Sequence, residues 1–419
     1  LFQMLLELFI SLLLGILFGV LTGLIPGIHT NIIGALILAL SVSLLVSIQP
    51  IYLVVFITAM AISNSFLNFI PSILLGCPNT DTELSVLPGH EFLKNKRAYE
   101  AIILTAYGGL ASLILLLIIL IPSFLFASPL QNILLQKLFF PKISIMASIL
   151  ILVSLHLIST EKNKFSALLV FLVSGILGLV VLGTIENQIP LLQGIQIKEP
   201  LLPLLTGLFG ASTLITSINS KTKIPRQKIK NPEIKKEFLK PLFGAMIASP
   251  LLSFLPSLGS GQAAVAGQLI SKTTKEGFMV LLGATNTLVM SFSFLSFYLV
   301  SKTRTGAVSA VENLIGNFPL KILVLIILVI LISGVISFFL TFPIAKLFCK
   351  QISTLNYTTI SIITLAFLII IVLLLSKPLG LLAFTISTIT GLYCISFNVR
   401  RTNMMGCLLL PTIIYYVLL

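Results

Sequence analysis

Charged side chains are scarce in this chain, and their scarcity indicates its class. Lys, Arg, Asp and Glu make up only 9% of the 419 residues, whereas 57% are hydrophobic. A soluble core does not require apolar side chains along the whole of such a length, so we expect a polytopic membrane protein. The apolar runs are continuous and do not alternate with polar residues, which excludes an outer-membrane β-barrel and predicts an all-α fold.

Metal-binding and nucleotide-binding patterns are also missing. The four cysteines, Cys77, Cys349, Cys394 and Cys407, form no Cys-x-x-Cys pair, and the three histidines lie far apart in sequence. Neither set has the spacing of a metal site. There is no G-x-x-x-x-G-K-[ST] motif and no G-x-G-x-x-G motif after a strand, so we expect no cofactor and no ATP hydrolysis by this chain.

Long apolar segments are plentiful instead, and a spanning helix takes about 20 such residues. We expect spans or half-helices at 4–24, 32–48, 51–75, 100–127, 143–158, 165–184, 200–217, 241–256, 278–299, 320–341, 357–375, 378–397 and 404–419. The first has no basic n-region and no small-residue cleavage site, so we expect a retained helix and not a signal peptide. Its Gly15, Gly19 and Gly23 recur every four residues, which predicts a face for close helix packing.

Basic residues gather near the middle of the chain. The net charge is +14, and the run 219–240 carries eight Lys or Arg against two Glu. The positive-inside rule explains such a loop as cytoplasmic, which leaves nucleic-acid binding as the weaker alternative. We therefore expect a multi-pass protein of the cytoplasmic membrane, with an N-terminal transmembrane repeat over 1–218, a basic linker over 219–240 and a C-terminal repeat over 241–419.

Two proline-containing breaks suggest that the halves are related. The stretch "GLIPGIHTNIIGA" at 23–35 resembles "SFLPSLGSGQAAVAG" at 253–267, with Pro26 matching Pro256. Paired Gly/Pro-interrupted segments in two halves are typical of a transporter's binding site. We expect two inverted-topology repeats whose broken helices and re-entrant segments meet near the membrane midplane.

A second block supports this alignment. Residues 62–86 align without a gap on 285–309, after a shift of one residue, so that Asn64 falls on Asn286 and Glu83 on Thr305. The identities are few, and the order of features carries the match. We expect Asn64 and Asn286 to hydrogen-bond between helices.

Polar residues at the breaks are the candidates for substrate binding. Non-helical backbone at membrane depth persists only where it is buried in protein or lines a wet cavity, and helix N-termini there favour anions. His29 is either a satisfied structural donor or a group that donates to an anion or relays a proton. The candidates for a polar chamber are His29, Thr30, Asn31, Ser260, Gly261, Gln262, Lys302 and Arg304.

The hydrophilic stretch "GCPNTDTELSVLPGHEF" contains Asp81, the sole aspartate of the chain, and Glu83. It is either an exposed loop or a segment that re-enters the membrane, where both acids are candidates for a proton, a coupling sodium ion or a substrate contact. The corresponding stretch of the second half carries Lys302 and Arg304. These lie either in a membrane-edge loop or beside an anionic head group, which Arg304 can bind in a bidentate manner.

These motifs resemble those of the TctA family, the large membrane subunits of tripartite tricarboxylate transporters. The resemblance rests on G-x-x-P-G near the N-terminus, P-(G/S)-x-G-(S/A) after the midpoint and "DTELSVLPGH" between them, and it is greatest to the archaeal branch. It covers nearly the whole chain. On this resemblance, Pro26, Gly27, Pro256 and Gly259 are the break residues around the substrate chamber.

The resemblance implies a secondary-active permease for organic anions such as polycarboxylates. It also implies a small membrane subunit and an extracytoplasmic binding protein as partners. Ser257, His29 and Asn31 depart from the family's usual break residues. Beyond these partners we expect membrane lipids and a small anionic substrate, no nucleic acid, and an oligomeric state that stays open.

Three functions compete. The first is transport of a di- or tricarboxylate-like anion coupled to Na⁺ or H⁺. The second is transport of a lipid-linked phosphate such as polyprenyl phosphate, which Lys302 and Arg304 suit equally well. The third is an intramembrane enzyme with Ser260 as nucleophile and His29 as base, but the motif is not G-x-S-x-G and no acid is placed to orient the histidine. We therefore predict a transporter and not an enzyme.

Overall fold

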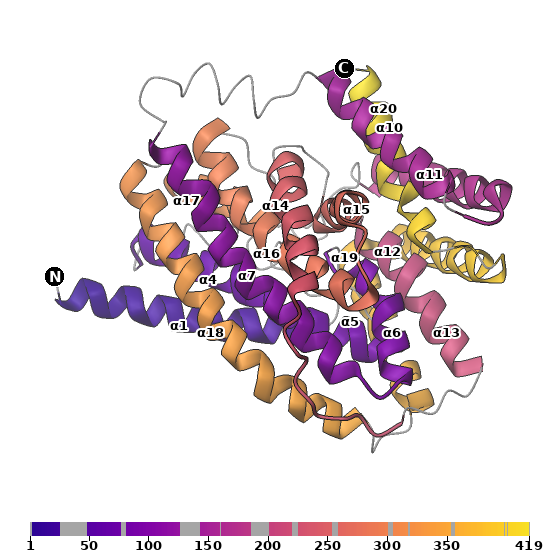
Figure 1. The fold of residues 1–419 in the computed structure, drawn as a ribbon, viewed down its shortest axis with the longest axis horizontal. Helices are drawn as coiled ribbons and strands as arrows, with labels where there is room; N and C mark the ends of the chain where they lie inside the picture. The colour runs from indigo at the N-terminus through magenta and orange to yellow at the C-terminus, as the bar shows by residue number, and fades with distance from the viewer. Residues whose placement is uncertain are drawn as a thin grey trace.

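A computed structural model describes residues 2–25, 48–76, 81–125, 143–159, 161–185, 201–219, 225–253, 259–300, 305–316, 319–352, 357–397, 399 and 401–418. Every regular element in these ranges is a helix (Figure 1). The elements are α1 (Phe2–Leu24), α4 (Pro50–Leu67), α5 (Phe69–Leu75), η1 (Glu83–Ser85), α6 (Val86–Lys94), α7 (Ala98–Leu125), α10 (Ile143–Ser159), α11 (Lys164–Ile185), α12 (Leu201–Leu205), η2 (Thr206–Ala211), α13 (Ser212–Asn219), η3 (Lys236–Phe238), α14 (Leu239–Ser253), α15 (Ser260–Ser271), α16 (Lys275–Val300), α17 (Gly306–Ile315), α18 (Leu320–Ile352), α19 (Tyr357–Ser396), η4 (Arg401–Met405) and α20 (Gly406–Leu418).

Among the described residues, seven helices are long and apolar enough to cross a membrane. They cover Phe2–Leu24, Pro50–Leu75, Ala98–Leu120, Lys164–Gly183, Lys275–Tyr298, Leu320–Ile352 and Pro378–Ser396. The chain is thus an all-α, multi-pass membrane protein, as the scarcity of charge predicts. The predicted span at 32–48 lies almost wholly outside the described residues.

Two boundary predictions were wrong. The sequence predicts separate spans at 357–375 and 378–397, but α19 runs through both with Pro378 inside it. Helix α18 likewise continues past its predicted end through Pro343. Proline removes one backbone donor, yet membrane helices tolerate it because neighbouring groups satisfy the freed carbonyl. Proline alone is therefore a poor marker of helix ends in this chain.

The glycine face of α1 packs against α4, as predicted. A Cβ atom built on Gly15 would come within 2.5 Å of the Phe56 carbonyl oxygen, and one on Gly19 within 2.5 Å of the Met60 carbonyl oxygen. Such distances leave no room for a side chain. Glycine therefore allows the two backbones to approach closely, which replaces the hydrophobic driving force that lipid does not supply.

Helices α7 and α16 also cross with their backbones in contact. A Cβ on Gly108 would lie 2.1 Å from a carbonyl oxygen of α16, and one on Gly283 would lie 1.9 Å from a carbonyl oxygen of α7. Arg97, just before α7, pairs with Glu276 at the start of α16 at 2.9 Å. The two helices therefore start at the same end of the molecule and join the N-terminal and C-terminal parts of the chain.

A second group of helices lies beside this one. Helix α20 packs on α11, and α19 packs on the run α12–η2–α13. Figure 1 shows α10, α11 and α20 on the right, well away from α1 and α18 on the left. Glycines again set the spacing, because a Cβ on Gly178 would lie 1.9 Å from the Cys407 carbonyl oxygen. Between the two groups lie α5, α6 and α15 (Figure 1).

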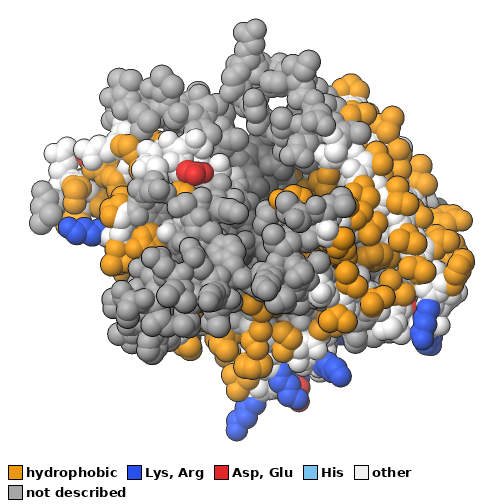
Figure 2. All heavy atoms as spheres, turned by 90° about the horizontal axis from the view of Figure 1, so that it is seen from above, with side chains coloured by type: hydrophobic (Ala, Val, Ile, Leu, Met, Phe, Trp, Pro, Cys, Tyr) orange, Lys and Arg blue, Asp and Glu red, His pale blue; other side chains and the backbone are white. Residues whose placement is uncertain are grey.

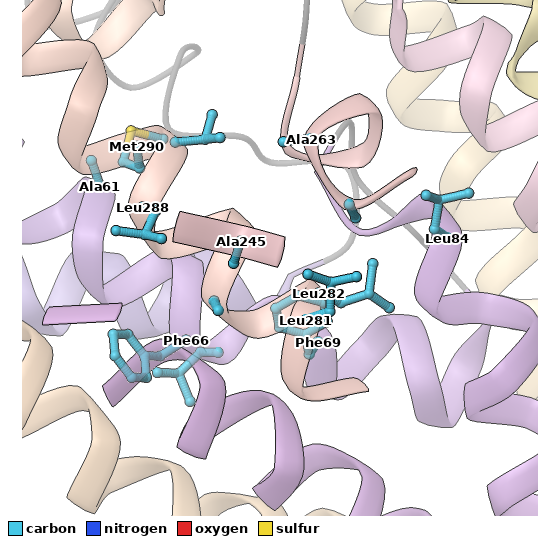
Figure 3. Close-up of a cluster of buried hydrophobic side chains, with 14 of the residues drawn as sticks. Ala61, Phe66, Phe69, Leu84, Ala245, Ala263, Leu281, Leu282, Leu288 and Met290 are labelled. Carbon is cyan, nitrogen blue, oxygen red and sulfur yellow. The ribbon is translucent and has the colours of Figure 1, made fainter. Parts of the chain in front are cut away.

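The apolar interior holds the short elements in place. Phe66 of α4 and Leu281 of α16 are almost fully buried and belong to one cluster (Figure 3). Leu84 of η1 and Ala263 of α15 are part of the same cluster. In water, burying a Leu or Phe side chain stabilises a fold by about 1.5–3 kcal/mol. Inside a membrane protein, van der Waals contacts between packed side chains supply much of this stabilisation. The core of both halves thus fixes where η1 and α15 meet.

The outer surface is apolar where lipid would contact it. Exposed large hydrophobic side chains recur along α1, α11, α18 and α19, among them Phe9, Phe165 and Phe339. Figure 2 shows a broad apolar flank with Lys and Arg at its margins. Contiguous apolar surface of this kind is unusual for a soluble protein and suits acyl chains.

Part of the basic central segment is bound to the helices. The Lys228 backbone N–H donates to the Lys96 carbonyl oxygen at 3.0 Å. Gln227 donates to the Leu93 carbonyl oxygen and accepts from the Ala98 backbone N–H, each at 3.0 Å. The predicted linker 219–240 therefore includes a strap, residues 225–235, across the α6–α7 corner.

Candidate functional site

The N-terminus of α15 forms the base of the site. Gly259 is the N-cap residue in extended conformation, and its backbone N–H donates to the Gln262 side-chain oxygen at 2.6 Å. That bond is the returning half of a capping box and fixes the first turn. The first backbone N–H groups of a helix have no partners within the helix, so this end carries a positive dipole.

Ser260 joins α15 to the acidic stretch of the N-terminal half. Its hydroxyl lies within hydrogen-bond distance of both the Asp81 carbonyl oxygen, at 3.1 Å, and the Asp81 carboxylate, at 3.2 Å. The two residues are 179 positions apart in sequence. The acidic stretch is therefore not a free loop at this point, and Asp81 lies against the start of α15.

Glu83 lies against the same turn of α15. Only 1% of its surface is exposed, and a Cβ atom on Gly261 would come within 2.0 Å of its Oε1 atom. Neither carboxyl oxygen has a hydrogen-bond partner in the described part of the chain. Glu83 belongs to η1, outside the seven apolar spans, and burial raises the pKa of its carboxyl well above its usual range, with a smaller contribution from Asp81.

Gln262 offers a second buried polar group. Its side chain is 2% exposed. The oxygen accepts from Gly259, whereas the Nε2 donor has no hydrogen-bond partner among the described residues. An unsatisfied buried donor costs about 1–3 kcal/mol.

The site's other walls come from elements that the sequence did not identify. The Met405 methyl lies 3.4 Å from where a Gly261 Cβ would be, and the Cys407 thiol interacts electrostatically with Glu83. The π-helical turn η2 contacts η1 from another side. Such turns are frequent at functional sites, but the apolar run around Thr206 gave no sign of one.

The structure brings together six of the predicted residues. Asp81, Glu83, Gly259, Ser260, Gly261 and Gln262 lie around the start of α15. The remaining predicted residues, Pro26, Gly27, His29, Thr30, Asn31, Pro256, Lys302 and Arg304, lie outside the described residues. The roles of all of them in binding stay predictions.

The two asparagines act between helices, as predicted. Asn64 donates to the Thr22 hydroxyl at 3.1 Å, and Asn286 donates to the Asn68 side-chain oxygen at 3.2 Å. Asn286 also donates to the Ser65 carbonyl oxygen at 3.0 Å. This buried ladder ties α1, α4 and α16 together.

A charged cluster at the strap end was not predicted. Arg97 makes bidentate contact with Glu100, at 2.7 and 2.6 Å, and also binds Glu276. Lys275 pairs with Glu91 beside it. The pair Arg97 and Glu100, three residues apart, is a signal that the sequence offered. In the described ranges, no three His, Cys, Asp or Glu residues gather as a metal site.

Buried polar groups at a helix N-terminus within a polytopic helical chain are typical of membrane transport proteins. Residues 9–406 match the tripartite tricarboxylate transporter TctA family, and the chain belongs to that family. The family is one of transporters, so the protein is a transporter and not an enzyme.

A relative agrees with the predicted archaeal branch. The chain is 30% identical over 367 residues to the uncharacterized protein MJ1079 of Methanocaldococcus jannaschii, covering 86% of this chain and 88% of that one. No solved structure matches.

Proposed function

We propose that this protein carries out secondary-active transport of a di- or tricarboxylate-like anion across the cytoplasmic membrane, coupled to Na⁺ or H⁺. Family membership establishes transport of the tricarboxylate type and does not favour the lipid-linked phosphate. The observation that carries the finer proposal is the contact of Ser260 with Asp81 at the N-terminus of α15. The proposal is further supported by the buried Gln262 amide and the Glu83 carboxyl, which lie at this same end of α15.

The charge of each group indicates whether it binds the substrate or takes part in ion coupling. The N-terminus of α15 and the Gln262 amide supply donors for a carboxylate. A basic pair at Lys302 and Arg304 would add positive charge from the stretch before α17. Asp81 and Glu83 repel an anion and instead suit the coupling step.

Contacts between the halves support an inverted repeat. The alignment that puts Asn64 on Asn286 also puts Ser65 on Thr287, and the hydroxyls of Ser65 and Thr287 are 3.3 Å apart. Two residues related by a two-fold axis contact each other only when both lie close to that axis. The contact between Ser65 and Thr287 is therefore what an axis passing between these two residues would produce. Helix α1 packs on α4 as α14 packs on α16, in keeping with the same relation.

Family membership also suggests the partner subunits of this protein. We propose a small membrane subunit and an extracytoplasmic binding protein as partners, with the basic segment 219–240 on the cytoplasmic side.

The test is stabilisation of the purified protein by candidate substrates. The chain has no tryptophan, but Cys349, Cys394 and Cys407 are buried, so a thiol-reactive fluorophore reports unfolding. Citrate, tricarballylate and succinate are compared with a short-chain polyprenyl phosphate, with and without sodium. A carboxylate that binds the folded state raises the melting temperature by mass action. Stabilisation by the lipid phosphate alone contradicts the proposal.

The site is tested by substitution. Ser260→Ala removes the hydroxyl that contacts Asp81, and we expect it to weaken or abolish the carboxylate shift. Ser396→Ala, at an exposed hydroxyl that bonds only within its own helix, is the matched control. Equal shifts in both variants would show that the ligand binds elsewhere.

A further inference from the structure

The most unusual polar group in the described structure is the Glu83 carboxyl. It is buried at 1% exposure, and neither oxygen has a hydrogen-bond partner among the described residues. An ionised carboxylate in such a position costs several kcal/mol, whereas the neutral acid costs far less. Its burial is thus compatible with folding only when the carboxyl is neutral or when an ion accompanies it.

The surroundings do not resemble a cation site. A sodium or calcium ion needs several oxygen ligands arranged around it. At the Gly261 turn beside Oε1 lie the Gly261 backbone and the Met405 methyl, and the Cys407 thiol and Asp81 interact electrostatically with the carboxyl. Of these only Asp81 offers a side-chain oxygen, and in the described ranges no group of three His, Cys, Asp or Glu gathers as a metal site.

The other titratable groups near Glu83 are few. Asp81 from its own segment and Cys407 from α20 interact with it electrostatically. The packed elements α5, α15 and η2 contain no titratable side chain. On α6, His90 lies against Gly76, and on α16 the charged Glu276 is paired at the strap end. The two groups shown to act electrostatically on Glu83, Asp81 and Cys407, carry no positive charge.

We propose that Glu83 is the proton-carrying group of the transport cycle, an inference that rests on the proposed function. In the conformation seen, the carboxyl holds a proton against the first turn of α15. When α15 moves away from η1, water reaches the carboxyl, and the proton passes from the carboxyl oxygen to water. Reprotonation from the opposite side restores the packed state, so the driving ion is H⁺ and not Na⁺.

The position of Gly261 explains how proton and substrate are linked. Its contact with Oε1 places the carboxyl at the turn that offers donors to the substrate. An ionised Glu83 would repel a carboxylate at that turn, and it would compete with the substrate for the helix dipole. A neutral Glu83 leaves the donors free. Protonation therefore favours anion binding, which is the requirement for co-transport.

The first measurement is direct and needs no substrate. Infrared difference spectroscopy detects the carbonyl stretch of a protonated carboxyl in the purified protein near neutral pH. We expect this band in the unaltered protein and in Glu233→Gln, whose carboxylate is 80% exposed. We expect it to be absent in Glu83→Gln. A band that persists in Glu83→Gln, or no band in the unaltered protein, overturns the proposal.

The second measurement tests the driving ion in proteoliposomes with radiolabelled citrate. Glu83→Gln stays neutral at every pH. We expect it to lose citrate accumulation driven by a pH gradient by tenfold or more, whereas Glu233→Gln, changed at an exposed residue, keeps it. Accumulation that still follows the pH gradient, or that in the unaltered protein follows only sodium, contradicts the proposal. If no protein transports citrate, the proposed substrate fails, while the infrared band still decides whether Glu83 holds a proton.

Discussion

Gly261 and Glu83 lie in direct contact, with only 2.0 Å between a Cβ position on Gly261 and Oε1 of Glu83. Gly261→Ala forces the buried carboxyl aside, and overpacking of this kind costs about 1–3 kcal/mol. We expect a lower melting temperature and reduced transport. Ser396→Ala, at an exposed hydroxyl that bonds within its own helix, is the control and should behave like the unaltered protein.

A double substitution separates this clash from a general defect of the helix. Glu83→Ala removes the atom that Gly261→Ala would meet. We expect the double variant to be less destabilised than the sum of the single variants, because the two residues are in contact. Strict additivity of the three melting temperatures would show that Gly261 and Glu83 do not pack together.

The crossing of α7 and α16 predicts a larger loss. The Cβ of Gly283→Ala would meet the backbone carbonyl of Thr105 at 1.9 Å, and backbone cannot move aside as a side chain can. We expect destabilisation of at least about 3 kcal/mol, with little folded protein recovered. Size-exclusion chromatography after membrane extraction measures the folded fraction. A monodisperse Gly283→Ala protein with an unchanged melting temperature would contradict this packing.

Much of the helical architecture was predictable because apolar length alone specifies a membrane helix. The glycine face of α1 was predictable from its spacing of four residues. The run through Pro378 was not, because the outcome depends on neighbours that satisfy a freed carbonyl. At the site, Ser260 and Asp81 were singled out separately, and their contact followed from tertiary packing.

Other features had weaker signals. Met405 and Cys407 look like ordinary apolar residues in the sequence, and only the fold brings them to Glu83. The same holds for the π-turn η2, which has no distinctive composition. Gln227 could not be assigned a structural role within a run of lysines, because its partners lie more than a hundred positions away.

The asparagine ladder predicts a cost for losing one donor. Asn286→Ala leaves the Asn68 side-chain oxygen and the Ser65 carbonyl without the donor that each now has. Because these groups are buried, we expect a loss of about 1–3 kcal/mol, seen as a lower melting temperature. Asn313→Ala removes an exposed asparagine that bonds within its own helix, and it should change little. Similar effects of both would argue against a buried ladder.

Gln227 predicts a change in protease sensitivity. Gln227→Ala removes the two side-chain bonds from Gln227 to the α6–α7 corner and leaves the backbone bond from Lys228 to Lys96 in place. We expect trypsin to cleave several-fold faster after Arg226 and Lys228, because cleavage follows the population of the opened segment. Glu233→Ala, in an exposed part of the same strap, is the control. Equal cleavage rates would show that these bonds do not hold the segment.

The raised pKa of Glu83 predicts how stability changes with pH. The folded protein keeps this proton to a higher pH than the unfolded chain, whose carboxyl titrates near the ordinary value of 4.5. Stability from the bound proton is therefore present at low pH and is lost as the pH rises from that value toward the raised pKa. Glu83→Gln has no proton to lose. The melting temperature of this variant minus that of the unaltered protein should therefore increase as the pH rises.

The comparison is made by thiol-reactive fluorescence from about pH 5 to about pH 9, the interval over which a raised carboxyl pKa acts. Glu233→Gln is measured alongside, because the Glu233 side chain is 80% exposed. Its curve should run parallel to that of the unaltered protein. A Glu83→Gln curve that also runs parallel would mean that Glu83 is already ionised in the folded state, with a cation beside it.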